Sequence, residues 1–369
     1  MRIAIISDGN PISTAYGKMG KYLSRFLKKK NIEVVNVSTR HTGEPVEYEG
    51  IPIYAGMNFY PNNQIAIDRS LETIEPDAVM MIRDLINVNL ARFNTGYSLA
   101  KYAGKCKRYA WTPVMGEIVY PDTIQATLQS FDHIFPMTDW AKTVLANDGI
   151  PYNIMTVVGG GFDPEVFRKR EDKRFSEEGV LFGTVALYTS QRKQLYVLLK
   201  SLKEYVKNYG PAKLYIHNNI VGIPYDVLGI ADILGVRKNL MFPLKNGQAD
   251  WIPEWGLSED DMARLYSSFT ATLSTSGFEG FNVPFLESLA CETPVIGTYS
   301  PFYDWTDQIR QVEGLQVSEE LADIGYVSDP RRFAEAMHGQ NKVDRNRLMD
   351  MTWDKQCQKI LDVMKGGEK

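Results

Sequence analysis

The stretch GFEGFNVPFLESLACETPVIG (residues 277–297) places two glutamates, Glu279 and Glu287, around an aromatic loop that contains Gly and Pro. We expect residues 271–275 to form a strand, residues 276–283 a loop and residues 284–290 a helix. Pro284 would stand near the first helical position, where its missing N–H costs little. A strand that leads through a loop into a helix is the repeating unit of α/β domains. The stretch therefore predicts one strand end of a parallel sheet, with two carboxylates beside it.

The same alternation of strand and helix runs along most of the chain. Residues 2–6, 18–30 and 33–38 predict a strand, an amphipathic helix and a second strand, which together make a βαβ unit. Further strands are expected at residues 78–82, 108–112, 133–136, 180–186, 213–217, 240–242, 270–274 and 293–297. The glycines at 159–161 and the charged stretch 168–178 fit a linker between two series of strands. The pattern predicts an α/β protein with two doubly wound, Rossmann-like domains facing a cleft, and ligands at the C-terminal ends of the strands.

Composition excludes several classes of protein. The chain has 369 residues, which suits two domains, and its 44% hydrophobic and 23% charged residues are typical of a soluble globular protein. A formal net charge of -4 gives no overall attraction to nucleic acid. The three cysteines are scattered and never form a CxxC pair, which argues against a disulfide framework or a zinc site and fits a reducing, cytoplasmic compartment.

Other patterns limit the ligands further. The loop at residues 13–17 lacks the G-x-G-x-x-G spacing of a dinucleotide site, which counts against an NAD enzyme, and the histidines show no metal-ligand spacing. We therefore expect no cofactor and no metal. The lysines and arginine of residues 18–30 mark one helix face; a solvated surface and peripheral attachment to anionic lipid are the two interpretations.

The chemistry around the loop suggests a ligand that carries both phosphate and hydroxyl groups. Backbone N–H groups of Asn282 and Val283 would point outward from a helix N-terminus, which attracts phosphate. Glu287, about one turn into the helix, suits the hydroxyls of a ribose, and Glu279 suits those of a second polyol. A diphosphate between two sugars, as in a sugar nucleotide, fits this arrangement. The alternative is that both glutamates simply favour a helix N-terminus and solvent.

The loop and its helix closely resemble the EGFG-containing stretch of family 4 retaining glycosyltransferases, which have the GT-B fold. Further segments resemble this family in the same order along nearly the whole chain. They are MRIAIISDGNPISTAYG (1–17), FDHIFPMTDWAKTVLANDGI (131–150), VVGGGFDPEVF (157–167), GTVALYTSQRKQLYVLLKSL (183–202), DDMARLYSSFTATLSTS (260–276) and MTWDKQCQKILDVM (351–364).

The resemblance implies a domain organisation. Residues 1–167 with 350–369 would form an N-terminal, acceptor-side domain, and residues 178–349 a C-terminal domain that binds the nucleotide sugar. The last helix would cross back onto the first domain. The implied activity is transfer of a hexose from a UDP- or GDP-sugar to an acceptor hydroxyl, with retention of anomeric configuration and without a metal.

The resemblance also implies roles for individual residues. Glu287 would bind the ribose and Glu279 the transferred sugar, while Lys193 would contact the donor phosphates, with Arg192 as a second, forked donor. The remaining donor-binding residues would be Tyr16, Gly17, Gly280, Phe281, Asn282 and Val283. Asn282 stands where Gly is usual, and Asn tolerates positive φ better than most residues.

The sequence departs from the family pattern at two places. Leu187 stands where a second basic residue is usual, and Met115 where a polar residue is expected near the reacting sugar. Glu117 is then either a substitute catalytic carboxylate or an exposed loop residue. A catalytically silent sugar-nucleotide-binding protein that acts through a partner is therefore the alternative function. The acceptor, whether glycan, lipid or protein, is not defined by the sequence.

Overall fold

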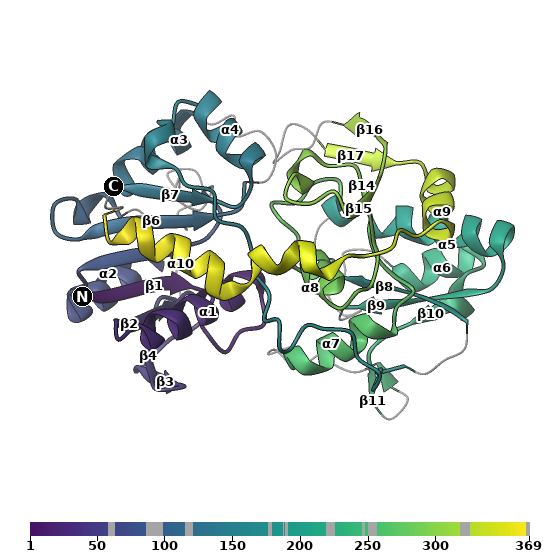
Figure 1. The fold of residues 1–369 in the computed structure, drawn as a ribbon, viewed down its shortest axis with the longest axis horizontal. Helices are drawn as coiled ribbons and strands as arrows, with labels where there is room; N and C mark the ends of the chain where they lie inside the picture. Colours follow the sequence, from purple (N-terminus) through teal and green to yellow (C-terminus); the bar gives the residue numbers. More distant parts are fainter. Residues whose placement is uncertain are drawn as a thin grey trace. The chain divides into compact units, whose positions relative to one another are not determined.

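The structure is a computed structural model. It describes residues 1–57, 63–85, 99–114, 121–175, 179–186, 188, 191–218, 226–245, 248–249, 257–317 and 325–366. The chain divides into two compact units (Figure 1). Unit 1 consists of Met1–Gly161 and Trp353–Lys369, and unit 2 of Phe162–Thr352. The C-terminal helix therefore belongs to the first unit, as the sequence predicts.

Unit 1 is built on a sheet whose described strands follow the order β3-β4-β2-β1-β5-β6-β7. All neighbours are parallel except β3 and β4, which pair antiparallel. The strands are β1 (Arg2–Ser7), β2 (Glu33–Ser38), β3 (Val46–Tyr48), β4 (Ile51–Ala55), β5 (Ala78–Ile82), β6 (Lys107–Thr112) and β7 (His133–Pro136). The helices are α1 (Ala15–Lys29), α2 (Asn63–Ile74), α3 (Pro121–Ser130), α4 (Asp139–Asn147) and α10 (Trp353–Met364), with short 3-10 turns at Ala100–Tyr102 and Tyr152–Ile154. The order β4-β2-β1-β5-β6-β7 is that of a doubly wound Rossmann-like domain, in which the chain reverses direction across the sheet between β1 and β5.

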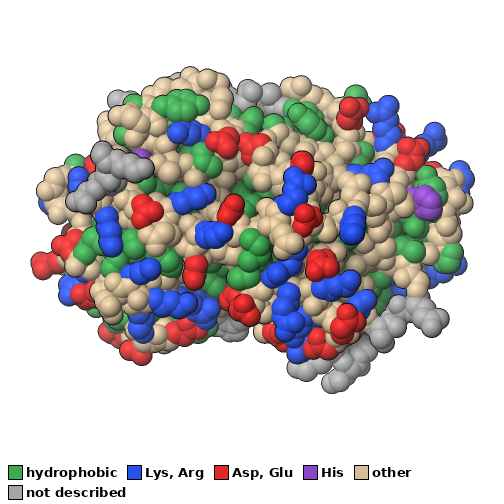
Figure 2. Space-filling view, viewed as in Figure 1, with side chains coloured by type: hydrophobic (Ala, Val, Ile, Leu, Met, Phe, Trp, Pro, Cys, Tyr) green, Lys and Arg blue, Asp and Glu red, His purple; other side chains and the backbone are tan. Residues whose placement is uncertain are grey.

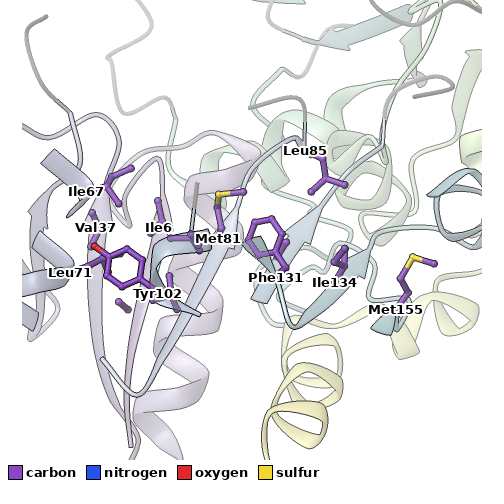
Figure 3. Close-up of a cluster of buried hydrophobic side chains, with 14 of the residues drawn as sticks. Ile6, Val37, Ile67, Leu71, Met81, Leu85, Tyr102, Phe131, Ile134 and Met155 are labelled. Atoms are coloured by element: carbon purple, nitrogen blue, oxygen red, sulfur yellow. The ribbon is translucent and has the colours of Figure 1, made fainter. Parts of the chain in front are cut away.

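The core of unit 1 comes from strands that are apolar on both faces. Every residue of β5 is buried, as expected for a central parallel strand covered by helices. Figure 3 shows Ile6 of β1, Val37 of β2 and Met81 of β5 beside side chains from the helices that cover the sheet. This packing fixes the ends of β1, β2 and β5 relative to one another.

Helix α1 begins earlier than the sequence pattern predicts. Thr14 is its N-cap and accepts a hydrogen bond from the Gly17 backbone N–H at 3.1 Å, so the helix starts at Ala15 rather than at residue 18. Tyr16 and Gly17 therefore lie in the first helical turn and not in a loop. The helix ends after Lys28 and Lys29, whose charges favour a helix C-terminus.

Helix α10 packs against α1 in unit 1 (Figure 1). Trp353 stacks on Tyr22 of α1, with ring centroids 5.0 Å apart, and meets Trp111 of β6 edge-on at 6.2 Å. Gly161 lies so close that a Cβ there would stand 2.8 Å from the Trp353 Cα. The indole thus joins the last helix to the first helix and to the sheet.

Unit 2 repeats the same topology, with described strands in the order β10-β9-β8-β13-β14-β15, and every pair in this sheet is parallel. Its strands are β8 (Val180–Val185), β9 (Ala212–His217), β10 (Leu240–Met241), β13 (Ala271–Ser274), β14 (Val295–Thr298) and β15 (Ile309–Val312). Its helices are α5 (Leu195–Tyr209), α6 (Val227–Leu234), α7 (Glu259–Ser268), α8 (Val283–Ala290) and α9 (Pro330–His338). Two small antiparallel pairs join β11 (Leu244–Lys245) to β12 (Gln248–Ala249) and β16 (Gly314–Val317) to β17 (Gly325–Ser328). Short 3-10 segments lie at Gln191–Lys193, Arg237–Asn239, Pro301–Tyr303 and Arg345–Met351.

The strand order of unit 2 reverses between β8 and β13. The predicted pair of doubly wound α/β domains is therefore confirmed, and the predicted strands agree with the observed ones to within two residues at either end. The loops that follow β8 and β13 start from neighbouring strands and lead in opposite directions. Ligands of doubly wound sheets bind at such a reversal, outside the carboxyl ends of the strands.

The packing of Trp353 gives a first prediction. Trp353→Ala should lower the free energy of unfolding by about 3–5 kcal/mol, because it removes a large buried side chain and leaves a cavity against Tyr22 and Trp111. Urea unfolding followed by circular dichroism measures the loss. Lys359→Ala, at an exposed position of the same helix, is the matched control and should change stability by less than about 0.5 kcal/mol. Equal unfolding midpoints for Trp353→Ala and wild type would show that the indole does not hold α10.

Candidate functional site

Three charged residues meet at the strand reversal of unit 2. Arg192 and Lys193 lie in the 3-10 turn that follows β8, and Glu279 lies in the loop that follows β13. Lys193 Nζ forms a direct ion pair with Glu279 Oε1, and Arg192 Nη1 lies 3.2 Å from Glu279 Oε2. Each carboxylate oxygen thus contacts one cation. We call these three residues the charge cluster.

The loop around the cluster is tied back on itself. Arg192 Nη1 also donates to the Phe278 carbonyl at 2.7 Å, and the Ser276 hydroxyl donates to the same carbonyl at 2.9 Å. The Gly277 backbone N–H donates to the Arg192 carbonyl at 2.9 Å. These bonds restrain the backbone around Glu279. Less conformational entropy is therefore lost when its carboxylate pairs with the cations.

Gln194 holds the other side of the cluster. It is buried, caps α5, and has left-handed backbone angles (φ 47°, ψ 42°), which are uncommon for a residue with a side chain. Its side-chain amide donates to the Tyr326 backbone carbonyl at 2.9 Å, and its backbone carbonyl accepts from the Thr275 hydroxyl at 3.0 Å. The left-handed turn lets the chain pass directly from the two cations into α5.

The cluster is poorly accessible to solvent, and its charges depend on one another. The side chains of Arg192, Lys193 and Glu279 are 23%, 14% and 10% exposed. Burial alone would raise the pKa of Glu279, but the charges of Lys193 and Arg192 outweigh it and lower the pKa to about 2. Burial lowers the pKa of Lys193, and Glu279 opposes that change. Glu279 is therefore a carboxylate throughout the physiological range.

An aromatic stack and side-chain hydrogen bonds hold the loop between Glu279 and α8. Asn282, the N-cap of α8, has positive φ (φ 68°, ψ 66°), so it takes the left-handed conformation that a Gly would take there. Its side-chain amide donates to the Tyr303 hydroxyl at 3.0 Å. Phe281 stacks on Trp305 with ring centroids 4.9 Å apart, and its carbonyl accepts from the Trp305 indole at 3.2 Å. Gly280, Phe281 and Val283 are all buried.

Glu287 lies on the buried side of α8. Its side chain is almost fully inaccessible, and Oε2 accepts a hydrogen bond from the Tyr266 hydroxyl of α7 at 3.0 Å. Burial, together with the Glu287 charge, raises the pKa of Tyr266 well above its ordinary value, so that hydroxyl stays a donor. The two glutamates of the opening stretch thus have different surroundings: Glu279 meets cations, and Glu287 meets a neutral hydroxyl.

Unit 1 has a second group of charges at its own strand reversal. Asp8 follows β1, is 1% exposed, and pairs with Arg83, which follows β5. Its Oδ1 also lies 3.4 Å from Arg40 Nε, and its Oδ2 accepts from the hydroxyl of Thr14, the N-cap of α1. Sequence reasoning missed this group. The sequence feature that could have indicated it is a charged residue directly after each of two apolar strands, Asp8 after β1 and Arg83 after β5.

The structure places the predicted residues Tyr16 and Gly17 beside this group. Arg83 lies over the Tyr16 ring, 5.4 Å from its centroid, and burial with the nearby Asp84 raises the pKa of the Tyr16 phenol well above its ordinary value. A Cβ on Gly17 would collide with the Ile12 carbonyl and stand 3.0 Å from that of Gly9. Packing against the preceding loop is therefore sufficient to explain a glycine at position 17, without a role in ligand binding.

Three predicted positions lie outside the described residues, namely Met115, Glu117 and Leu187. Among the described residues, sequence reasoning also missed the partners that hold the charge cluster. Gln194 and Ser276 stand in the quoted segments but carry no distinctive motif. Tyr266, which bonds to Glu287, lies 21 residues before it, so its role depends on the packing of α7 on α8.

The surface features bear on the expected partners. On the face in Figure 2, Lys and Arg side chains are interspersed with Asp and Glu and do not gather in one large patch. On α1, Arg25 Nε bonds to Glu49 at 2.7 Å, and Lys28 donates to the Glu49 and Gly50 carbonyls. None of the helices in the described part of the chain has the length and apolar character needed to cross a bilayer. The same residues contain no group of three or more His, Cys, Asp or Glu side chains placed to hold a metal ion.

Comparison with solved structures identifies the fold. The lipopolysaccharide outer core galactosyltransferase WaaB in its apo form is similar over 100% of both chains, with 15% sequence identity and a TM-score of 0.64. The sucrose-phosphate synthase of Thermosynechococcus elongatus is similar over 99% of this chain and 98% of its own, with 13% identity and a TM-score of 0.69. HepE of Anabaena, in complex with UDP and glucose, is similar over 99% and 100%, with 10% identity and a TM-score of 0.70.

These structural neighbours are GT-B glycosyltransferases, and the likeness shows that this chain has their fold. The fold predicted from the sequence is therefore confirmed. No family model matches the chain. No curated protein matches it either.

The buried charge cluster predicts a pH dependence of stability. The folded pKa of Glu279, about 2, lies below its ordinary value of 4.5, so the stabilisation is complete above the ordinary pKa and disappears as the pH falls through the folded one. Between about pH 6 and about pH 3 the wild type should lose about 2 kcal/mol relative to Glu279→Gln, which cannot titrate there. Urea unfolding at a series of pH values measures the difference. Glu335→Gln, on the exposed face of α9, corrects for the change in net charge. A constant difference between wild type and Glu279→Gln would show that Glu279 is not ionised against the two cations.

Proposed function

We propose that this protein is a glycosyltransferase that moves a hexose from a UDP- or GDP-sugar to an acceptor hydroxyl. The observation that carries the proposal is the charge cluster. Two cations and a carboxylate converge at the strand reversal of a doubly wound domain, where such domains bind nucleotides. The GT-B fold supports the same conclusion.

The cations suit a departing diphosphate. When the bond between sugar and phosphate breaks, negative charge grows on the nucleoside diphosphate, and fixed positive groups stabilise it most in the transition state. Glu279 holds both Lys193 and Arg192, and the Phe278 carbonyl also holds Arg192, so little reorganisation is needed during the reaction. We assign the donor phosphates to these two residues and to the backbone of Gly280, Phe281, Asn282 and Val283.

The two glutamates suit hydroxyl groups. Glu279 stays ionised, so it can accept hydrogen bonds from the transferred sugar beside the phosphates. Glu287 lies about one turn into α8, and we assign it to the ribose, which would share the carboxylate with the Tyr266 hydroxyl. HepE was solved with UDP and glucose, and the pneumococcal O-GlcNAc transferase GtfA with UDP and GlcNAc, which makes UDP-sugars the first donors to test.

Retention of configuration and the roles of the two domains follow from the sequence resemblance. In this proposal the acceptor attacks from the front face, and the leaving diphosphate assists removal of its proton. Residues 178–349 bind the donor, and residues 1–167 with 350–369 form the acceptor-side domain. Tyr16 and Gly17 stay assigned to the donor, and Glu117 to the substitute catalytic carboxylate. The basic face of α1 is a candidate for peripheral membrane contact if the acceptor is a lipid, although Arg25 and Lys28 are already engaged within unit 1.

The alternative is a protein that binds a sugar nucleotide without turning it over. It rests on Leu187 and Met115, which replace residues that are usual in the family. Both readings use the same donor site, so nucleotide binding alone does not distinguish them, whereas turnover does.

Glu287 can be tested through nucleotide affinity. Glu287→Ala should weaken binding of UDP or GDP by on the order of 1.5–3 kcal/mol, because charged hydrogen bonds to the ribose are lost. Calorimetry measures the change. Tyr266→Phe is the matched control, since it removes the internal bond to the same carboxylate and leaves the carboxylate in place. If Tyr266→Phe costs as much affinity as Glu287→Ala, then Glu287 acts through packing and not through the ribose.

Lys193 can be tested through turnover. Lys193→Met should lower the rate of nucleoside diphosphate release by about 100-fold or more, the scale of losing one electrostatic donor in a transition state. Donor affinity should fall by less. Hydrolysis of a panel of UDP- and GDP-sugars without acceptor is a workable assay, because water replaces the acceptor hydroxyl. Lys203→Met, at an exposed position on α5, is the control for loss of a lysine.

The same assay decides between the two functions. Equal rates for wild type and Lys193→Met would contradict the catalytic role of Lys193. Absence of release across the full panel, with candidate acceptors added, would leave the binding protein as the function.

A further inference from the structure

Within the charge cluster, the Glu279 carboxylate occupies the same two cations that a phosphate would use. The donors that suit a diphosphate, Lys193 Nζ and Arg192 Nη1, both contact the Glu279 carboxylate. Among the described residues, the hydrogen-bond partner of the Lys193 ammonium is this carboxylate. Glu279 is itself 10% exposed and ionised, so its negative charge is only weakly screened by solvent. Any diphosphate bound to the same two cations therefore lies close to a fixed negative charge.

The sugar nucleotide and the nucleoside diphosphate place different groups beside the Glu279 carboxylate. In a sugar nucleotide the terminal phosphate is esterified, and the sugar hydroxyls can donate hydrogen bonds to Glu279. After transfer the hydroxyls have left with the acceptor, and the phosphate oxygen that carried the sugar has gained the electron pair of the broken bond. A terminal phosphate carries about 1.5 to 2 negative charges at neutral pH. The product thus exposes new negative charge where the hydroxyls had been.

We propose that Glu279 selects the intact donor over the nucleoside diphosphate and drives release of that product. It does so by competing with the terminal phosphate for Arg192 and Lys193 and by repelling its added charge. This inference rests on the proposed donor site, and it gives Glu279 a task beyond contact with the sugar. Before transfer, the carboxylate accepts hydrogen bonds from the sugar. After transfer, it competes with the terminal phosphate for Arg192 and Lys193.

The geometry around Glu279 supports such an exchange. Arg192 is anchored by the Phe278 carbonyl at 2.7 Å as well as by Glu279, so it stays in place whichever anion it meets. Gly277 and Gln194 fix the backbone on both sides. Because these contacts restrain the loop on both sides of Glu279, repulsion between the carboxylate and the phosphate appears as a loss of affinity.

The test compares two nucleoside diphosphates with their sugar nucleotides on the wild type and two variants. Calorimetry is performed with UDP and UDP-glucose, and with GDP and GDP-mannose, on the wild type, Glu279→Gln and Glu335→Gln. Removing one nearby charge should tighten binding of the nucleoside diphosphate by roughly tenfold or more. Binding of the intact donor should tighten less or weaken, because the carboxylate that accepts its hydroxyls is gone. Glu335→Gln, an exposed glutamate of the same unit, should bind both ligands as the wild type does.

Each outcome separates this inference from the proposed function. If folded Glu279→Gln binds UDP and GDP no tighter than the wild type, the competition is overturned while the donor site stands. If none of the three proteins binds any of the four nucleotides, the proposed donor site fails and the inference fails with it. Thermal unfolding without nucleotide establishes folding. If Glu279→Gln does not fold, Glu279→Ser, which also removes the charge, must show the same tightening of UDP or GDP for the inference to survive.

Discussion

The burial of one carboxylate against two cations is the constraint on which the arrangement of unit 2 depends. An ionised Glu279 with 10% of its side chain exposed is tolerable only because Lys193 and Arg192 neutralise it. The cations come from the loop after β8 and the carboxylate from the loop after β13, so the two strands must be neighbours. Parallel pairing of β8 with β13 provides this, and the left-handed turn at Gln194 lets the chain leave the cluster directly into α5. Fold and charge cluster therefore support each other.

The sequence predicts the parts of the molecule that have local causes. Apolar runs such as residues 78–82 are buried on both faces, and the predicted strand coincides with β5. The unusual Asn at position 282 was expected to tolerate positive φ, and its φ is 68°. Helix α1 was predicted to start three residues too late because Thr14 was not considered as its cap, although capping by a hydroxyl is also a local effect.

What the sequence does not predict is non-local. The ion pair between Lys193 and Glu279 joins residues 86 positions apart, and the resemblance identifies both residues without indicating that they contact each other. Asp8 and Arg83 are 75 positions apart, and Arg83 belongs to none of the segments that carry the resemblance. Such contacts depend on the order of strands in the sheet, which hydrophobic periodicity does not determine. Gln194 illustrates the same limit, because its hydrogen-bond partners come from β17 and from the loop after β13, both far away in the sequence.

The two units show why a buried charge cluster at a strand reversal does not by itself identify a ligand site. In both, a carboxylate meets two cations just beyond neighbouring parallel strands: Asp8 meets Arg83 and Arg40, and Glu279 meets Lys193 and Arg192. Asp8, however, is 1% exposed and also bonds to Thr14, so its charge serves to fix the first turn of α1. Glu279 keeps more exposed surface and stands at the start of the loop that leads to the N-terminus of α8. The same arrangement of charges therefore fixes the start of a helix in unit 1, whereas in unit 2 it holds a more exposed carboxylate beside the loop that leads to α8.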